Sequence, residues 1–238
     1  MKRTKGEAAA FPFCVHGIRN GAHPAVDRRI PRHYNSRCIK EETAAAACRN
    51  AEKERKCMKY NQKVITGSGT EVQIRNAEAS DGAAVLENFN QTHAETDYLL
   101  SYPDENRFDA EQESRFLARK AESPQEIELL AVVNGRVVGT AGIDAVGTKY
   151  KVAHRAEFGI SVLKEYWGLG IGRALMEACI RCARDAGFVQ LELSVVADNA
   201  RAVAMYQRAG FAEYGRNPKG FRSRTAGFQE VVFMRLEL

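Results

Sequence analysis

The sequence predicts an α+β (α/β) fold built on a mixed, mostly antiparallel sheet. Strand-like runs, apolar or alternating, recur from Glu71 to the C-terminus. Amphipathic helical stretches separate some of these runs but not others, so hairpins and strand–helix–strand crossovers both occur. The pair Asn134-Gly135 between two apolar runs is a strong signal for a tight hairpin. We expect six to seven strands and about four helices.

Each element is placed by its own pattern. Ser80 or Asp81 can cap the first helix, and Gly210 ends the last. The third helix has the apolar stripe Ile171, Leu175, Ala178 and Cys182. The expected helices cover residues 82–94, 110–121, 170–186 and 199–208. The expected strands cover residues 72–75, 127–133, 136–143, 157–163, 191–196, 211–214 and 231–236.

Composition restricts the class of protein. The chain of 238 residues is 45% hydrophobic and 27% charged, as in ordinary globular proteins. No apolar run reaches the length of a bilayer span, and the N-terminus lacks the pattern of a signal peptide. We therefore expect no membrane association and a cytoplasmic location. Cys179 and Cys182 lie one helical turn apart without a further ligand, so no metal site is predicted.

The basic charge is concentrated at the N-terminus. Residues 1–57 hold 13 Lys and Arg against 6 Asp and Glu, whereas the remainder holds 22 against 24. Nucleic-acid binding requires basic residues clustered on a folded face, so no nucleic-acid partner is expected. Residues 1–57 also lack sustained apolar periodicity. We interpret them as a disordered basic extension, followed by a leader over 58–70 and a domain over 71–238.

The extension also differs from the domain in cysteine content, since it holds four of the six cysteines. Together with the charge imbalance, this predicts that translation begins at Met58 and that residues 1–57 are an upstream extension. A natural basic tail that binds an acidic partner or a membrane surface is the alternative.

A glycine-rich turn separates the strand over 157–163 from the helix that follows. It reads Trp167-Gly-Leu-Gly-Ile-Gly172. Glycines let backbone N–H groups point at an anion, and a helix N-terminus adds further N–H groups and a favourable dipole. This arrangement suits a pyrophosphate. A dinucleotide-binding fingerprint is the alternative, but Leu175 replaces its third glycine, and too few residues follow for a doubly wound domain.

The second motif is Asn199-x-x-Ala202-x-x-x-Tyr206-x-x-x-Gly210-Phe211. Asn199 and Tyr206 are seven residues apart, so they lie on one face of the helix. With the glycine turn in this order and separation, the chain resembles the GNAT superfamily of N-acetyltransferases over nearly all of residues 71–238. The resemblance implies a sheet splayed between its fourth and fifth strands and acetyl-CoA as co-substrate.

The resemblance also implies the site residues. It assigns the open edge of the fourth strand to the pantetheine arm, near Ile160, Val162 and Leu163, and gives Asn199 a contact with that arm. It makes Tyr206 the acid that protonates the leaving thiolate. Trp167 stands where the family usually has Gln or Arg, so no side-chain contact is carried over to that position. The pyrophosphate is assigned to the backbone amides of Leu169, Gly170, Ile171, Gly172 and Arg173.

The implied reaction transfers an acetyl group from acetyl-CoA to a primary amine by direct attack in a ternary complex. An amine with a pKa of about 10.4 is mostly protonated at neutral pH and must lose a proton before it attacks. Glu157 is the candidate base, directly or through water. It shares a strand face with Gly159 and Ser161. A surface or salt-bridged glutamate is the alternative interpretation of Glu157.

Two connecting segments are expected to border the acceptor. Residues 97–105 are aromatic and acidic, and residues 216–224 are basic. They leave a small amine, an amino acid, an antibiotic, a protein N-terminus and a lysine open as acceptors. A second copy of the chain, in a homodimer, is a further expected partner. The alternative function is a non-catalytic module that binds acyl-CoA as a sensor. Tyr206 and Glu157 argue against it, because a pure binder needs neither.

Overall fold

The computed structural model describes residues 57–238, so the predictions on residues 1–56 lie outside the described part. The α-helices are α2 (Gly82–Glu95), α3 (Ala110–Glu122), α4 (Ile171–Asp185) and α5 (Ala200–Arg208). The strands are β1 (Asn61–Ile65), β2 (Glu71–Asn76), β3 (Ile127–Val133), β4 (Arg136–Ala145), β5 (Arg155–Val162), β6 (Gln190–Val196), β7 (Ala212–Ser223) and β8 (Gly227–Glu237). Short 3-10 turns lie at Ala79–Asp81, Pro103–Glu105 and Lys164–Tyr166.

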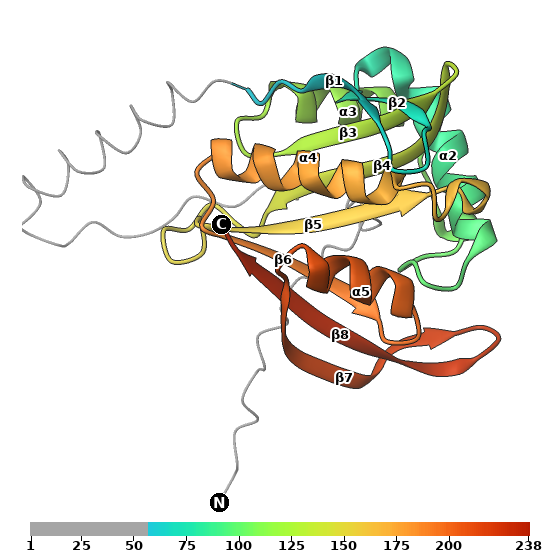
Figure 1. Ribbon diagram of the computed structural model, residues 1–238, viewed down its shortest axis with the longest axis vertical. Coiled ribbons are helices and arrows are strands. Elements are labelled where there is room, and N and C mark those ends of the chain that lie inside the picture. Colours follow the sequence, from blue (N-terminus) through green and yellow to red (C-terminus); the bar gives the residue numbers. More distant parts are fainter. Residues whose placement is uncertain (1–56) are drawn as a thin grey trace, which may run out of the picture.

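The strands form one mixed sheet in the order β1-β2-β3-β4-β5-β6-β8-β7 (Figure 1). Neighbours are antiparallel except β5 and β6, which run parallel. The α+β prediction is confirmed, but the sheet has eight strands rather than six to seven. The additional strand, β1, lies within the predicted leader and pairs with β2 from Asn61↔Arg75 to Ile65↔Glu71. Its residues are mostly exposed, so it has little of the apolar pattern that predicts a strand.

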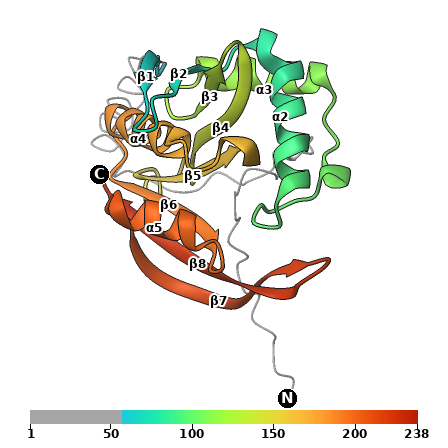
Figure 2. The same ribbon diagram turned by 45° about the vertical axis from the view of Figure 1, so that its right-hand side comes forward.

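Helices cover both faces of the sheet, and β3 shows how its residues are divided between them. Leu129 and Ala131 belong to the large core that includes the apolar stripe of α4. Leu130 packs into a second cluster with Val85 of α2 and Leu117 of α3. Successive strand residues point to opposite faces, so α4 and the α2–α3 pair lie on opposite sides (Figure 2). None of the described helices is long and apolar enough to cross a membrane.

The β3–β4 and β7–β8 hairpins differ in how well their sequences predict them. Asn134 (φ 50°) and Gly135 (φ 81°) both adopt positive φ, which confirms the predicted tight turn between β3 and β4. Residues 216–224 were predicted as a loop, but most of them belong to β7, which pairs with β8 as far as Ser223↔Gly227. The ladder is interrupted near Pro218, where the register shifts, and its side chains are largely exposed. A polar edge strand of this kind carries little sequence signal.

A buried charge cluster joins α3 to the sheet. The Lys120 ammonium lies 3.1 Å from a carboxylate oxygen of Glu128 on β3 and 2.8 Å from one of Asp144 on β4. The Lys120 side chain is 1% exposed. Although burial alone would lower the pKa of Lys120, the two carboxylates raise it above its ordinary value. The ammonium is therefore charged, and it is stabilised by both carboxylates.

Candidate active site

Strands β5 and β6 separate after a short parallel contact. Within residues 57–238, they pair only where Arg155–Glu157 meets Gln190–Glu192, and beyond that point they diverge (Figure 2). A cleft of about 920 Å³ occupies the opening, lined by β5, β6, α4, α5 and the C-terminal end of α2. This is the predicted splay between the fourth and fifth strands, counted from β2.

The edge of β5 that faces the cleft has free backbone groups. The Leu163 N–H donates to the Val138 carbonyl, and the Arg155 carbonyl accepts from the Val146 N–H, so odd-numbered residues of β5 bond to β4. In an antiparallel pair the intervening residues point their backbone groups the other way. The peptide groups of Ile160 therefore face the opening. They can form hydrogen bonds with an extended ligand that carries amides.

A glycine turn precedes α4 at one end of the cleft. Gly168 and Gly170 adopt positive φ (83° and 86°), which residues with a Cβ rarely do. A Cβ on Gly170 would also lie 3.2 Å from the Cβ of Thr66, in the loop between β1 and β2. Within the described part of the chain, the backbone N–H groups of residues 168–173 have no hydrogen-bond acceptor. Free amides at a helix N-terminus fit a phosphate or pyrophosphate.

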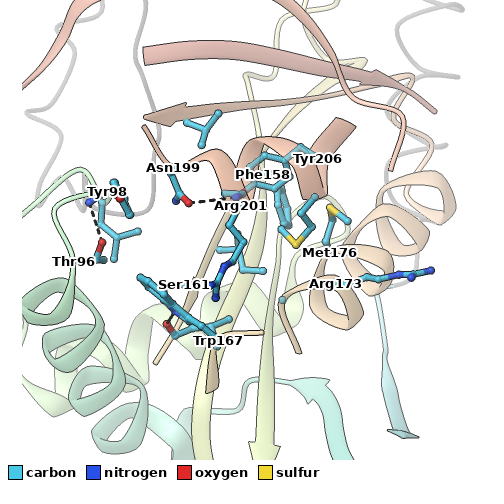
Figure 3. A pocket seen from close by; sticks show the side chains of 18 of the residues that line it. Thr96, Tyr98, Phe158, Ser161, Trp167, Arg173, Met176, Asn199, Arg201 and Tyr206 are labelled. Carbon is cyan, nitrogen blue, oxygen red and sulfur yellow. Dashed lines mark hydrogen bonds between the residues drawn. The ribbon is translucent and has the colours of Figure 1, made fainter. Parts of the chain in front are cut away.

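Helix α5 places the second motif on the opposite wall. Asn199 is its N-cap, and the side-chain oxygen accepts from the Ala202 N–H at 3.3 Å. The amide nitrogen of Asn199 is thereby left to donate into the cleft. Asn199 and Tyr206 both line the cleft, as their spacing predicts (Figure 3).

Tyr206 lies deep in this wall, with 6% of its surface exposed. Its ring packs edge-on against Phe158 of β5, at 6.3 Å between centroids, and against Phe211, at 5.8 Å. Burial raises the pKa of the Tyr206 hydroxyl well above its ordinary value. The phenol is therefore protonated at neutral pH and can donate a proton or a hydrogen bond.

Most of the predicted ligand-binding residues come together at this cleft. Leu169 and Ile171 were predicted to act through their backbone amides, and the Ile171 side chain is fully buried in the core. Leu163 is an exception, because its N–H bonds to Val138 and its side chain is buried, so it faces away from the opening. The predicted residues that line the cleft are Ile160, Val162, Gly170, Gly172, Arg173, Asn199 and Tyr206.

Glu157 lies at the closed end of the splay. It is half-buried and pairs in register with Asp144 on β4 and Glu192 on β6. Its neighbour Phe158 lines the cleft, whereas Glu157 does not. The position is one residue from the opening, and its role as a base stays a prediction.

The structure adds residues that sequence reasoning missed. Arg201 lies on the α5 wall of the cleft, and Thr96 and Tyr98 lie on the wall that follows α2. Their sequence signal is weak: Arg201 is in the first turn after Asn199, and Tyr98 is inside the segment predicted to border the acceptor. Trp167 departs from the family pattern at its position. Its indole N–H donates to the Val162 carbonyl at 2.7 Å.

The segment after α2 is joined to the β7–β8 hairpin beside the cleft. Asp97 accepts hydrogen bonds from the hydroxyls of Ser223 and Tyr102, and these bonds hold the pKa of Asp97 below its ordinary value. Arg224 pairs with Asp104 at 2.8 Å and stacks over the Tyr102 ring. The two segments predicted to border the acceptor are thus bonded to each other.

Comparison with known proteins agrees with this geometry. The model of the acetyltransferase (GNAT) family matches residues 89–211. The chain is 30% identical over 166 residues to the L-amino acid N-acetyltransferase AaaT of Escherichia coli, covering 69% of this chain and 97% of AaaT. The chain belongs to the GNAT family of acetyltransferases.

Solved structures show the same fold. A GNAT-family acetyltransferase from Streptococcus pneumoniae matches with a TM-score of 0.68 and 32% identity, over 71% of this chain and all of that one. The yncA structure from Salmonella typhimurium, which holds acetyl-CoA, matches with a TM-score of 0.62. At 22% identity over 70% of this chain and 94% of that chain, yncA supports the fold alone. Family membership confirms acetyl-CoA as co-substrate, and the free amides and open strand edge of the cleft fit its pyrophosphate and amide-bearing arm.

Proposed function

We propose that this GNAT acetyltransferase transfers an acetyl group from acetyl-CoA to a primary amine by direct attack in a ternary complex. The observation that carries the proposal is the position of Tyr206, buried against Phe158 where the sheet splays. A protonated phenol here can act on a thiolate that leaves between β5 and β6. Binding of acyl-CoA without turnover would not require it.

The chain's own groups have separable tasks in this reaction. Acetyl-CoA supplies the thioester carbonyl that the amine attacks and the sulfur that departs. The Ile160 N–H faces the opening and is placed to polarise the carbonyl oxygen. As the C–N bond forms and the C–S bond breaks, Tyr206 donates its proton to the sulfur. A thiol has a pKa of about 8.5 in water, and the burial that raises the pKa of Tyr206 also favours a neutral thiol.

The amine must lose a proton before or during the attack. We assign this step to Glu157, acting through water, because it is the carboxylate on β5 nearest the open part of the strand. Asp144 and Glu192 flank it in register, so the local field is acidic and favours a cationic amine. Arg155 is bonded to Glu192 and Lys120 to Asp144, and both cations partly offset that charge.

We propose a small amino acid-like amine as the acceptor. The contacts of Asp97 with Ser223 and of Arg224 with Asp104 bridge the segments beside the cleft, which favours a small acceptor over a folded protein chain. The L-amino acid N-acetyltransferase AaaT, which the chain matches over 97% of its length, supports the same class.

The test is acetyl transfer with a panel of acceptors. The purified protein is mixed with acetyl-CoA and either free L-amino acids, simple amines, or peptides with a free N-terminus, and free thiol is monitored. Thiol release that depends on an amino acid, with the N-acetyl product seen by mass spectrometry, is the expected result. Turnover of peptides alone would overturn the acceptor class. Tight acetyl-CoA binding without turnover of any amine would favour the sensor alternative.

A further inference from the structure

The α5 wall of the cleft carries a cation whose charge the proposed chemistry does not use. Arg201 lies in the first turn of α5 and extends across the cleft toward Trp167 (Figure 3). Its guanidinium carbon is 5.8 Å from the centroid of the Trp167 ring. One of its terminal nitrogens would lie 3.9 Å from a Cβ on Gly168. The guanidinium thus lies beside the glycine turn while its backbone belongs to the opposite wall.

Arg201 differs from the cation on the α4 side. Arg173 lines the same cleft, but its guanidinium is bonded to Glu177 at 2.7 Å. Within residues 57–238, no carboxylate lies within ion-pair distance of Arg201. A guanidinium held on an aromatic face keeps all its N–H donors in its plane, where they can bind an anion in bidentate fashion.

Trp167 holds this arrangement in place. Its indole N–H is fixed to the Val162 carbonyl at 2.7 Å, so the ring is anchored to the end of β5. The ring therefore offers Arg201 a fixed surface directly before the glycine turn. Residue 167 is uncharged and Arg173 is paired with Glu177. Arg201 brings to the turn, from α5, a cation that has no carboxylate partner among residues 57–238.

We propose that Arg201, positioned by Trp167, is the side-chain ligand of the acetyl-CoA diphosphate, opposite the free amides of residues 168–173. The diphosphate is then bound from both walls, by backbone N–H groups from the α4 side and by a guanidinium from the α5 side. Binding the donor would draw α4 and α5 together across the splay. This inference rests on the proposed use of acetyl-CoA but not on the identity of the amine.

The test compares three donors that differ in their phosphates. They are acetyl-CoA, acetyl-dephospho-CoA, which lacks the 3′-phosphate, and acetylpantetheine, which has no phosphate. Arg201→Gln should lower kcat/KM for the first two by the same factor, about 10- to 100-fold, because a charge-assisted hydrogen bond to the diphosphate is lost. The loss should be in KM, with kcat retained. The Arg201→Gln variant should use acetylpantetheine as efficiently as the wild type does.

Binding is measured separately from turnover. Trp167 is the single tryptophan of the chain, so its fluorescence reports on the cleft directly. CoA and dephospho-CoA should change this fluorescence in the wild type, and in Arg201→Gln the change should require about 10- to 100-fold more ligand. Calorimetry with Trp167→Leu should show weaker CoA binding. Adding Arg201→Gln to that variant should reduce CoA affinity by a smaller factor than Arg201→Gln does in the wild-type background.

Arg184→Gln is the matched control, because Arg184 is exposed at the far end of α4 and the charge change is the same. It should leave all three donors unaffected. Unchanged CoA affinity in Arg201→Gln would overturn the inference. An equal loss of kcat/KM with acetylpantetheine would also overturn it, and so would a loss of kcat/KM seen with acetyl-CoA but not with acetyl-dephospho-CoA. The last result would assign Arg201 to the 3′-phosphate. Failure of the proposed amine transfer would leave these binding results intact, so the two hypotheses are tested separately.

Discussion

Replacing Tyr206 by Phe removes one hydroxyl and little else. The ring contacts with Phe158 and Phe211, at 6.3 and 5.8 Å, are retained. Burial is the one cause of the raised pKa of Tyr206, and no hydrogen bond within the described residues contributes to it. The free energy of unfolding should therefore change by no more than about 0.5 kcal/mol. Turnover should fall by roughly 10²- to 10⁴-fold, because the positioned acid is lost.

The assay is thiol release at saturating acetyl-CoA, with thermal unfolding measured on the same samples. Donor affinity should stay near that of the wild type, so the effect should appear in kcat. Tyr60→Phe is the control, because that hydroxyl bonds to exposed Gln62 outside the cleft. Undiminished turnover in Tyr206→Phe would reduce Tyr206 to a packing residue. A lowered melting temperature together with lost activity would attribute the effect to folding.

The same assignment fixes a pH dependence. Because burial raises the pKa of Tyr206, the acid stays protonated as the pH rises from 7 to 9. The deprotonated fraction of an amine with a pKa of about 10.4 rises over the same interval, so turnover by the wild type should rise with pH. A wild-type kcat that falls between pH 7 and 9 would contradict a protonated Tyr206.

Three further changes test other parts of the molecule. Gly170→Glu should abolish the thermal stabilisation by acetyl-CoA, because it adds bulk and negative charge at the free amides. That stabilisation is about 2.7 kcal/mol when acetyl-CoA is present at one hundred times its Kd, and a full shift of the melting temperature in the variant would refute the glycine-turn assignment. Lys120→Met should lower the unfolding free energy by about 3–5 kcal/mol in urea titrations, since Glu128 and Asp144 lose their shared cation; unchanged stability would mean that the cluster contributes nothing. Glu157→Gln should reduce kcat/KM at pH 6–7, and the deficit should shrink as the pH rises toward the amine pKa of about 10.4, where the amine deprotonates unaided; superimposable pH profiles would exclude Glu157 from the mechanism.

The sequence by itself determined the features that depend on a few consecutive residues. The Asn134-Gly135 turn, the apolar stripe of α4 and the glycine turn are local, because each depends on backbone conformation or on the period of one element. The spacing of Asn199 and Tyr206 also fixed their common face before any tertiary contact was known. For these reasons most of the predicted ligand-binding residues line one cleft.

Tertiary structure alone decided the features that depend on distant partners. The strand β1 exists because β2 offers it an edge, and the outer half of β7 exists because β8 pairs with it. Leu163 turned away from the cleft because its N–H bonds to Val138, and Arg201 reached the glycine turn because Trp167 lies across from α5. Each of these outcomes depends on which segments become neighbours, and that is set by packing of the whole sheet rather than by any local pattern.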